Sequence, residues 1–361
     1  MRTKVTEKTF TGQSFYVGID CHKKSWKVTI LGEEYEHKTF SQDPVPKLLD
    51  QYLRHNFPGG CYKAVYEAGF SGFGACRALQ QLGVNCMVVH AADVPSNQKE
   101  QQQKNDKADS RKLARCLRNR DFRGIDIPSH KTETDRALIR QRFRIVKDLS
   151  RIKNRVKSLL YQFGIAIPTH FTDSSQSRNW TKAYIDWLKN LSVDWQSLRQ
   201  VLDSYIRLAE YLRKELLLVN KSMRKMAEEA YYKGNHQLLL SIPGIGVTTS
   251  MMVLTQIDDV KRFATLDQMC NYIGLVPSMH GSGDKMQTGK LIKRGRKELK
   301  IMLIEASWDA IRKDPALMAK FNELSKKMHK NKAIIRIARK MASRIRHVLI
   351  HQQKYELGIL E

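Results

Sequence analysis

Four carboxylates in the first third of the chain have the types and spacing that metal chemistry requires. Asp20 ends the apolar alternating run SFYVGID, and Glu67 ends the similar run YKAVYE. Asp106 and Asp109 lie three residues apart at the start of a helical pattern, so both project to one face. Carboxylate oxygens suit Mg²⁺, and two such ions about 3.5–4 Å apart clamp the attacking and leaving oxygens of a phosphodiester. We therefore predict a Mg²⁺ site here, with Mn²⁺ able to substitute.

Each carboxylate also has an ordinary structural explanation. An Asp after a strand commonly forms a turn, and N-D-K-x-D is typical of a helix start with favourable dipole charge. The combination within one fold favours the metal site. The sequence contains no C-x-x-C or H-E-x-x-H pair that would predict zinc instead. Its six scattered cysteines fit packing roles in a reducing cytoplasm.

The elements that must position these residues follow the order β-β-β-α-β-α-β-α. The predicted strands are SFYVGID, SWKVTIL, EYEHKTF, YKAVYEA and NCMVVH, and helical patterns separate the later ones. Three strands joined by tight turns and continued by crossover units indicate a mixed α/β sheet with helices on its faces. This is the element order of the ribonuclease H-like (RuvC-like) fold, and we assign it to residues 1–128.

Residues 129–234 predict a basic helical region with coiled-coil packing. Apolar residues recur there every 3.5 positions on average, in two seams separated by a segment that contains Pro168. The first seam consists of Ile145, Leu149, Ile152, Val156, Leu159 and Phe163, and the second of Leu202, Tyr205, Ala209, Leu212, Leu216, Val219, Met223 and Met226. The two arms pair either within one chain or between subunits.

Residues 235–361 predict a mainly helical domain that opens on a helix-hairpin-helix motif. Pro243, Gly244 and Gly246 interrupt two helical patterns in QLLLSIPGIGVTTS. Glycines let a backbone approach a phosphate, whose charge suits the N-terminus of the second helix. A turn of purely structural use is the alternative. The following segment, GLVPSMHGSGDKMQTGKLIKRGRKELK, is predicted to be a loop.

The chain resembles one family of insertion-sequence transposases. GIDCHKKSWKVTI, VYEAGFSGFG and KNDKADSRKLA are similar to the DEDD catalytic set of transposases related to Piv DNA invertases. These enzymes are bridge-RNA-guided serine recombinases with a RuvC-like domain. IPGIG, NYIGLVPS and HGSGDKMQTGKLIKRGRKELK resemble their second block, and the resemblance covers nearly the whole chain.

The resemblance implies roles for particular residues. The metal-binding acidic set falls on Asp20, Glu67, Asp106 and Asp109, and the nucleophilic serine on Ser282 in H-G-S-G. Gly281 stands where the family often has a second serine, which leaves Ser278 as the weaker alternative nucleophile. A serine hydroxyl needs a base or a metal to become a good nucleophile. Four nearby cations could contact phosphates: Lys285, Lys290, Lys293 and Arg294.

The charge of the chain predicts a polyanionic partner. Its 63 Lys and Arg residues exceed 36 Asp and Glu residues, which gives a net charge of +27, while 42% hydrophobic residues suffice for folded domains. The basic stretch with Arg136, Arg140 and Arg144 favours contact with nucleic acid over a merely solvated face. No membrane span or signal peptide is evident, so we expect a bacterial cytoplasmic protein, associated with the nucleoid when it acts.

The resemblance implies an RNA-guided DNA recombinase. The implied partners are a structured guide RNA, donor and target DNA, and further copies of the chain as a dimer that assembles to a tetramer. The reaction implied is Mg²⁺-dependent strand cleavage and exchange through a covalent phosphoserine-DNA intermediate. Two other functions stay open: a metal-dependent nuclease of the Holliday-junction type, which uses water as nucleophile, and a non-enzymatic nucleic-acid-binding scaffold.

Overall fold

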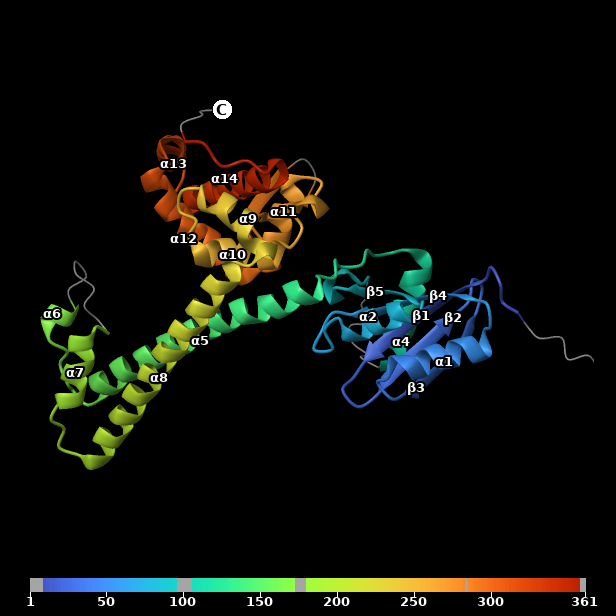
Figure 1. Cartoon of the computed structure of the whole chain (residues 1–361), viewed down its shortest axis with the longest axis horizontal. Coiled ribbons are helices and arrows are strands. Elements are labelled where there is room, and N and C mark those ends of the chain that lie inside the picture. Colours follow the sequence, from blue (N-terminus) through green and yellow to red (C-terminus); the bar gives the residue numbers. More distant parts are fainter. Residues whose placement is uncertain (1–8, 96–105, 173–179, 283–284, 358–361) are drawn as a thin grey trace, which may run out of the picture. The chain divides into compact units, whose positions relative to one another are not determined.

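The structure, a computed structural model, describes residues 9–95, 106–172, 180–282 and 285–357. The side chains of residues 280–288 lie outside the described part. The chain divides into two units, unit 1 (Met1–Ile127) and unit 2 (Pro128–Glu361), and each is described by itself (Figure 1).

Unit 1 is built on a five-stranded mixed sheet in the order β3-β2-β1-β4-β5. The strands are β1 (Ser14–Cys21), β2 (Trp26–Leu31), β3 (Glu36–Gln42), β4 (Cys61–Glu67) and β5 (Asn85–Val89). The helices are α1 (Pro46–Asn56), α2 (Gly74–Gln81), the 3-10 helix η1 (Ala91–Asp93) and α4 (Asp106–Asn119). β1 to β3 are antiparallel, whereas β4 and β5 run parallel to β1. The predicted mixed α/β domain is confirmed.

The two faces of this sheet are covered by different helices. Along β1, Phe15, Val17 and Ile19 join a hydrophobic cluster that includes buried residues of α1 and α2. Tyr16 points to the opposite face and joins a second cluster with Leu113 of α4. Successive side chains of a strand alternate between faces, so every second residue of β1 faces α4.

Gly18 sets how closely α4 approaches the sheet. A Cβ atom at this position would lie 2.0 Å from the carbonyl oxygen of Ser110 and 2.5 Å from the amide nitrogen of Ala114. Both atoms belong to the α4 backbone, which cannot move aside as a side chain can. Next to this contact, the hydroxyls of Thr29 and Ser110 share a buried hydrogen bond of 2.9 Å. The first turns of α4 are thereby held against β1 and β2.

The described residues of unit 2 are helical apart from one hairpin and the connecting segments. Its helices are α5 (His130–Gln162), α6 (Thr169–Thr172), α7 (Lys182–Asn190), α8 (Gln196–Ala227), α9 (Ala230–Leu240), α10 (Val247–Ile257), η3 (Val260–Arg262), α11 (Leu266–Ile273), α12 (Lys297–Lys313), α13 (Pro315–Lys327) and α14 (Lys330–His351). β6 (Pro277–Ser282) and β7 (Lys285–Leu291) pair antiparallel, where the sequence analysis predicted a loop. That prediction was wrong because backbone pairing forms this hairpin, and its glycine-interrupted strands show no clear alternation of apolar residues.

Helices α5 and α8 form an antiparallel hairpin within one chain (Figure 1). Ile152 and Val156 of α5 pack in one cluster with Leu202 and Ile206 of α8, and buried residues of α7 join them. The buried positions drift away from the heptad register, since Ile206 replaces the predicted Tyr205. An α-helix with 3.6 residues per turn drifts in this way from a 3.5-residue repeat. Pairing is thus intramolecular here, and the coiled-coil supercoil stays a prediction.

The base of this hairpin belongs to the main core of unit 2. Ile139 of α5 and Met223 of α8 lie in the same hydrophobic cluster as Leu254 of α10 and Ile337 of α14. The division that the sequence analysis placed at residue 234 therefore falls inside α9 and inside one continuous core. Among the described residues, no helix is both long enough and apolar enough to cross a membrane.

We expect Gly18→Ala to destabilise unit 1 by about 1–3 kcal/mol, because the added methyl group forces α4 away from β1. Hydrogen–deuterium exchange of peptides from β1 and α4 measures this change separately from unit 2. Gly74→Ala is the matched control, since nothing lies within 4 Å of its added Cβ. Equal protection of α4 in both variants would contradict the proposed role of the Gly18 contact.

Candidate functional site

Asp20 and Glu67 lie at the ends of two neighbouring parallel strands. Ile19 of β1 is in register with Tyr66 of β4, so the next residue of each strand is Asp20 and Glu67 respectively. Ile19 and Tyr66 both pack toward α1 and α2. By alternation Asp20 and Glu67 face the other side, which is the side of α4.

The start of α4 brings two more carboxylates to this face. Asp106 and Asp109 both lie in its first turn. Asp106 Oδ2 is 3.3 Å from His22 Nε2, and Asp20 Oδ2 is 3.1 Å from the same nitrogen. Ligand atoms of Asp20, His22 and Asp106 lie within 4.8 Å of one another. Glu67 and Asp109 lie on the same face but are not part of this three-residue group.

Burial and neighbouring negative charge both disfavour the ionised form of Asp20. Burial raises the pKa of the Asp20 carboxyl; His22 opposes the rise, and the charges of Asp106 and Asp109 add to it. Loss of solvent disfavours the ionised form of Asp20 most, and the two neighbouring carboxylates disfavour it further. A cation at this position would stabilise that form. The donor set therefore fits a divalent ion, for which Asp20 and Asp106 are the nearest ligands.

His22 was not among the residues predicted for the site. It lies one residue beyond the end of β1 and two positions after Asp20, and this short spacing was the available signal. Its imidazole lies between the two carboxylates and is half exposed. Nitrogen ligands suit transition metals better than Mg²⁺, so an imidazole beside the carboxylates makes Mn²⁺ a suitable ion for this group.

The predicted nucleophile lies in the β6–β7 hairpin. Ser282 is the last residue of β6 and is in register with Lys285, the first residue of β7. The side chains of both residues lie outside the described part of the structure. Ser278, the alternative nucleophile, lies near the other end of β6 and is partly buried. Its role, like that of Ser282, stays a prediction.

The predicted cations after the hairpin are accessible to a ligand. Lys290 near the end of β7, and Lys293 and Arg294 between β7 and the start of α12, are all exposed. Arg140 of α5 is partly buried, and both burial and the nearby charge of Arg296 lower its pKa. This part of unit 2 therefore concentrates positive charge close to the hairpin, as a nucleic-acid-binding surface requires.

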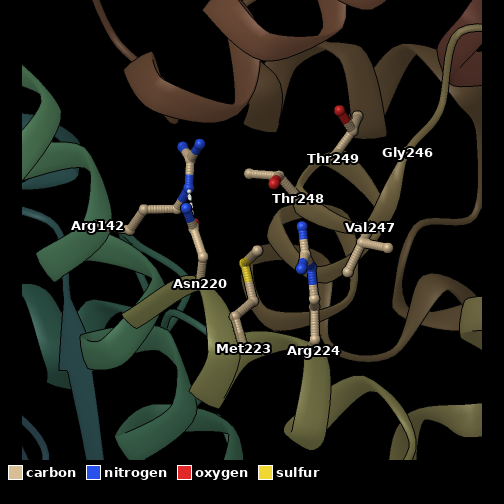
Figure 2. Close-up of a pocket in the computed structure, with 8 residues that line it drawn as sticks. All are labelled: Arg142, Asn220, Met223, Arg224, Gly246, Val247, Thr248 and Thr249. Atoms are coloured by element: carbon tan, nitrogen blue, oxygen red, sulfur yellow. Dashed lines mark hydrogen bonds between the residues drawn. The ribbon is translucent and has the colours of Figure 1, made fainter. Parts of the chain in front are cut away.

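The two glycines of the PGIG turn differ in their surroundings. Gly244 has a φ of +84°, and a Cβ there would lie 2.3 Å from the carbonyl oxygen of Ala306 in α12. Packing against α12 therefore accounts for a glycine at position 244, and its contact with a phosphate stays a prediction. Gly246 is exposed, with nothing within 4 Å of a Cβ, and Pro243 precedes both in the turn. Gly246 borders the pocket drawn in Figure 2.

Arg136 is not available to nucleic acid. Its side chain is 6% exposed, and its Nε donates a hydrogen bond of 2.8 Å to the carbonyl oxygen of Thr255 in α10. The predicted polyanion contact at Arg136 was therefore wrong, because the first turns of α5 are packed against α10. Arg144, two turns further along the same helix, is exposed.

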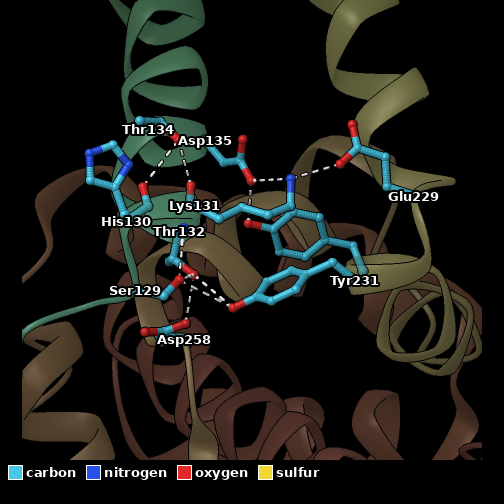
Figure 3. A network of polar contacts seen from close by, with 10 residues as sticks. Ser129, His130, Lys131, Thr132, Thr134, Asp135, Glu229, Tyr231 and Asp258 are labelled. Atoms are coloured by element: carbon cyan, nitrogen blue, oxygen red, sulfur yellow. Dashed lines mark hydrogen bonds and ion pairs between the residues drawn. The ribbon is translucent and has the colours of Figure 1, made fainter.

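A polar network fixes the same end of α5 (Figure 3). The Thr132 hydroxyl donates to Asp258 at the end of α10, over 2.8 Å, and also lies 3.2 Å from the Tyr231 hydroxyl. Lys131 forms ion pairs with Glu229 at 2.7 Å and Asp135 at 3.1 Å. These contacts join α5 to α9 and α10 where the chain enters unit 2.

Two family models of transposases match the segments that carry these carboxylates and cations. A model described as "Transposase" matches residues 17–165, including all four predicted carboxylates, and a model described as "Transposase IS116/IS110/IS902 family" matches residues 236–322, including the PGIG turn and Ser282. The class is therefore that of insertion-sequence transposases with a DEDD acidic set, which implies a divalent metal ion.

Several curated relatives are described in the same terms. The transposase for insertion sequence element IS1533 of Leptospira borgpetersenii is 27% identical over 261 residues, 68% of this chain and 70% of the relative. The transposase for IS1111A of Coxiella burnetii is 26% identical over 71% of this chain and 69% of the relative. The putative transposase y4rJ of Sinorhizobium fredii is 24% identical over 91% and 90%. With two family models matched in order over more than half of its length, the chain belongs to the IS110/IS116 family of transposases.

We expect Asp20→Asn and Asp106→Asn each to weaken binding of Mn²⁺ by at least about tenfold, since each removes a charged ligand. Titration calorimetry of the purified protein measures this directly. Glu34→Gln is the control, because it removes one exposed carboxylate from the turn between β2 and β3, at the other end of the sheet. If all three variants bind Mn²⁺ as the unaltered protein does, this group is not a metal site.

Arg136→Ala should lower the free energy of unfolding by about 1–3 kcal/mol, because it leaves the buried Thr255 carbonyl without its donor. Arg144→Ala should change it by less than about 0.5 kcal/mol, since Arg144 is exposed. Thermal unfolding of the full chain compares the two. Similar unfolding temperatures for both variants would show that the buried bond contributes little.

Proposed function

We propose that this transposase is an RNA-guided DNA recombinase that cleaves and exchanges strands with a divalent metal ion and a serine nucleophile. The observation that carries the proposal is the gathering of Asp20, Asp106 and His22 within 4.8 Å, on the sheet face that Glu67 and Asp109 share. Carboxylates brought together at the ends of adjacent strands suit metal-assisted reaction of a phosphodiester.

The metal is proposed to be Mg²⁺, held by Asp20 and Asp106 with Glu67 and Asp109 as further ligands. When bound, a pair of such ions polarises the phosphodiester and stabilises the charge that develops on its oxygens. The protein residues do the positioning: the Gly18 contact places the first turn of α4, and the parallel pairing of β1 and β4 places the two strand-end carboxylates.

Ser282 is the proposed nucleophile. A base accepts the hydroxyl proton, and the serine oxygen forms a bond to phosphorus while the bond to the 3′-oxygen breaks. The departing 3′-oxygen takes up a proton, so the products are a phosphoserine link to the 5′ end of one DNA segment and a free 3′-hydroxyl on the other. Support comes from the match of the hairpin segment to the second family model and from the exposed cations Lys290, Lys293 and Arg294 beside it.

A guide RNA and a higher oligomer complete the proposal. The net charge of +27 suits a protein that holds two polyanions at once, guide RNA and DNA. Target choice would then rest on base pairing, and the protein would recognise RNA through shape and backbone. We propose a dimer that assembles to a tetramer, in which one active site draws on more than one subunit.

Two other functions make different predictions for the same variants. A Holliday-junction-type nuclease uses water as nucleophile, so it cleaves DNA without any covalent protein-DNA link. A non-enzymatic scaffold binds nucleic acid through its basic surfaces and yields no new DNA product. The crowded carboxylates of unit 1 argue against the scaffold, and the match of the serine segment argues against the nuclease.

The test is incubation of the purified protein with co-purified RNA, DNA of its own element and Mg²⁺, followed by denaturing electrophoresis. We expect a protein-DNA adduct that Ser282→Ala abolishes, because no other group then forms the phosphoester. Asp20→Asn should reduce both adduct and cleavage by at least about a hundredfold, as loss of a metal ligand removes transition-state stabilisation.

Ser278→Ala is the matched control and should leave the adduct in place. An adduct that is lost in Ser278→Ala and kept in Ser282→Ala would transfer the role to Ser278. Cleavage that persists without any adduct in both serine variants would support the nuclease. Unchanged DNA in the presence of RNA and Mg²⁺, with binding intact, would support the scaffold.

A further inference from the structure

A pocket lies where the α5–α8 hairpin meets the start of α10. It encloses about 350 Å³ and is lined by eight residues from three helices and the PGIG turn. The lining residues are Arg142, Asn220, Met223, Arg224, Gly246, Val247, Thr248 and Thr249 (Figure 2). They include two arginines and no acidic residue, so the pocket carries positive charge without compensation from its own walls.

Both arginines have donor groups to spare. The Nε of Arg142 donates to Asn220 Oδ1 over 2.8 Å, which orients the guanidinium but leaves its two terminal nitrogens unused in any hydrogen bond of the described residues. Burial lowers the pKa of Arg142, so its charge is poorly solvated. Arg224 is exposed, and its guanidinium forms no ion pair or hydrogen bond with the described part of the chain. Figure 2 shows it directed toward Thr248.

The start of α10 adds backbone and hydroxyl donors to the pocket. Helix α10 begins at Val247 after Gly246, and no side chain caps its first amide groups. Unpaired N–H groups and the positive end of the helix dipole favour an anion at this position. Thr248 and Thr249 supply hydroxyls, and Gly246 leaves the approach open, as nothing lies within 4 Å of a Cβ there.

We propose that this pocket binds one phosphodiester group of a nucleic-acid backbone, clamped between Arg142 and Arg224 of the helical hairpin and the start of α10. Forked guanidinium donors match phosphate oxygens, and a partly desolvated cation gains most from an anion. The lining has no aromatic side chain on which a base could stack, so the ligand is the backbone and not a nucleotide recognised by its base. The inference rests on the proposed function only for its choice of nucleic acid as the source of phosphate.

The position of the pocket gives the contact a second effect. Arg142 and Arg224 come from the base of the α5–α8 hairpin, and the other donors come from α10 in the core of unit 2. One phosphate bound here would therefore tie the hairpin and the PGIG turn to the same nucleotide. The turn then contributes through Gly246 and the start of α10, whereas Gly244 serves the packing against α12.

The test compares Thr248→Glu with Thr248→Gln in the full-length protein. A glutamate near the start of α10 suits the helix dipole, so the variant should fold, yet its carboxylate competes with a phosphate for the two arginines. We expect Thr248→Glu to weaken binding of a fluorescein-labelled DNA duplex or RNA hairpin about tenfold more than Thr248→Gln, which has nearly the same size. Fluorescence anisotropy measures binding, and circular dichroism verifies folding.

Arg224→Ala provides an independent measurement. Loss of one phosphate contact should reduce the slope of log affinity against log salt by about 1. Lys214→Ala is the control, because Lys214 is an exposed residue of α8 outside the pocket. It should have little effect on the affinity for the duplex or for the RNA hairpin. A loss with only the duplex, or only the RNA hairpin, identifies the source of the phosphate.

Affinities and salt slopes that are the same for the unaltered protein, Thr248→Glu and Arg224→Ala would overturn the pocket proposal. The proposed function would survive that result, because its own test is the adduct and the effect of Asp20→Asn. The opposite result is also possible: the pocket variants lose binding, and the unaltered protein cleaves DNA without forming an adduct. That result would support the pocket and rule out the serine mechanism.

Discussion

The contact between Gly18 and the backbone of α4 is the constraint on which the candidate site of unit 1 depends. A carboxylate at the end of β1 can face a carboxylate on α4 only if strand and helix approach to backbone distance, and only glycine permits that approach. Asp20 follows two residues later on the same face, and Asp106 lies one turn before Ser110. The same close packing that brings the charges together also makes them repel.

Much of the fold of unit 1 could be predicted from its sequence, because strands that bury one face carry apolar residues at every second position. Phe15, Val17 and Ile19 alternate with residues of the opposite face, which predicts both the strand and the direction of Asp20. His22 escaped prediction for the converse reason: a single histidine beyond a strand carries no repeat, and its closeness to Asp106 arises only when α4 folds onto the sheet. The sequence therefore predicted the carboxylates of this group, Asp20 and Asp106, but not the imidazole of His22.

The basic residues of α5 show where sequence periodicity fails. Arg136, Arg140 and Arg144 are spaced by four and therefore share one stripe, but the spacing does not say what that stripe meets. The stripe leaves the core as the helix proceeds, so Arg136 is buried against Thr255, Arg140 is partly buried and Arg144 is exposed. Likewise the heptad seams predict a helix pair, while the core shared by Ile139 and the C-terminal helices depends on tertiary packing.

The clustered carboxylates of unit 1 have a thermodynamic consequence for folding. A cation that binds Asp20 and Asp106 only in the folded state adds its binding free energy to stability, about 2.7 kcal/mol at an ion concentration one hundred times the dissociation constant. Newly made chains would thus gain rigidity in the first turn of α4 together with the ion. Metal availability and the folded population of this unit are linked quantities, so chelation should lower the unfolding temperature of unit 1.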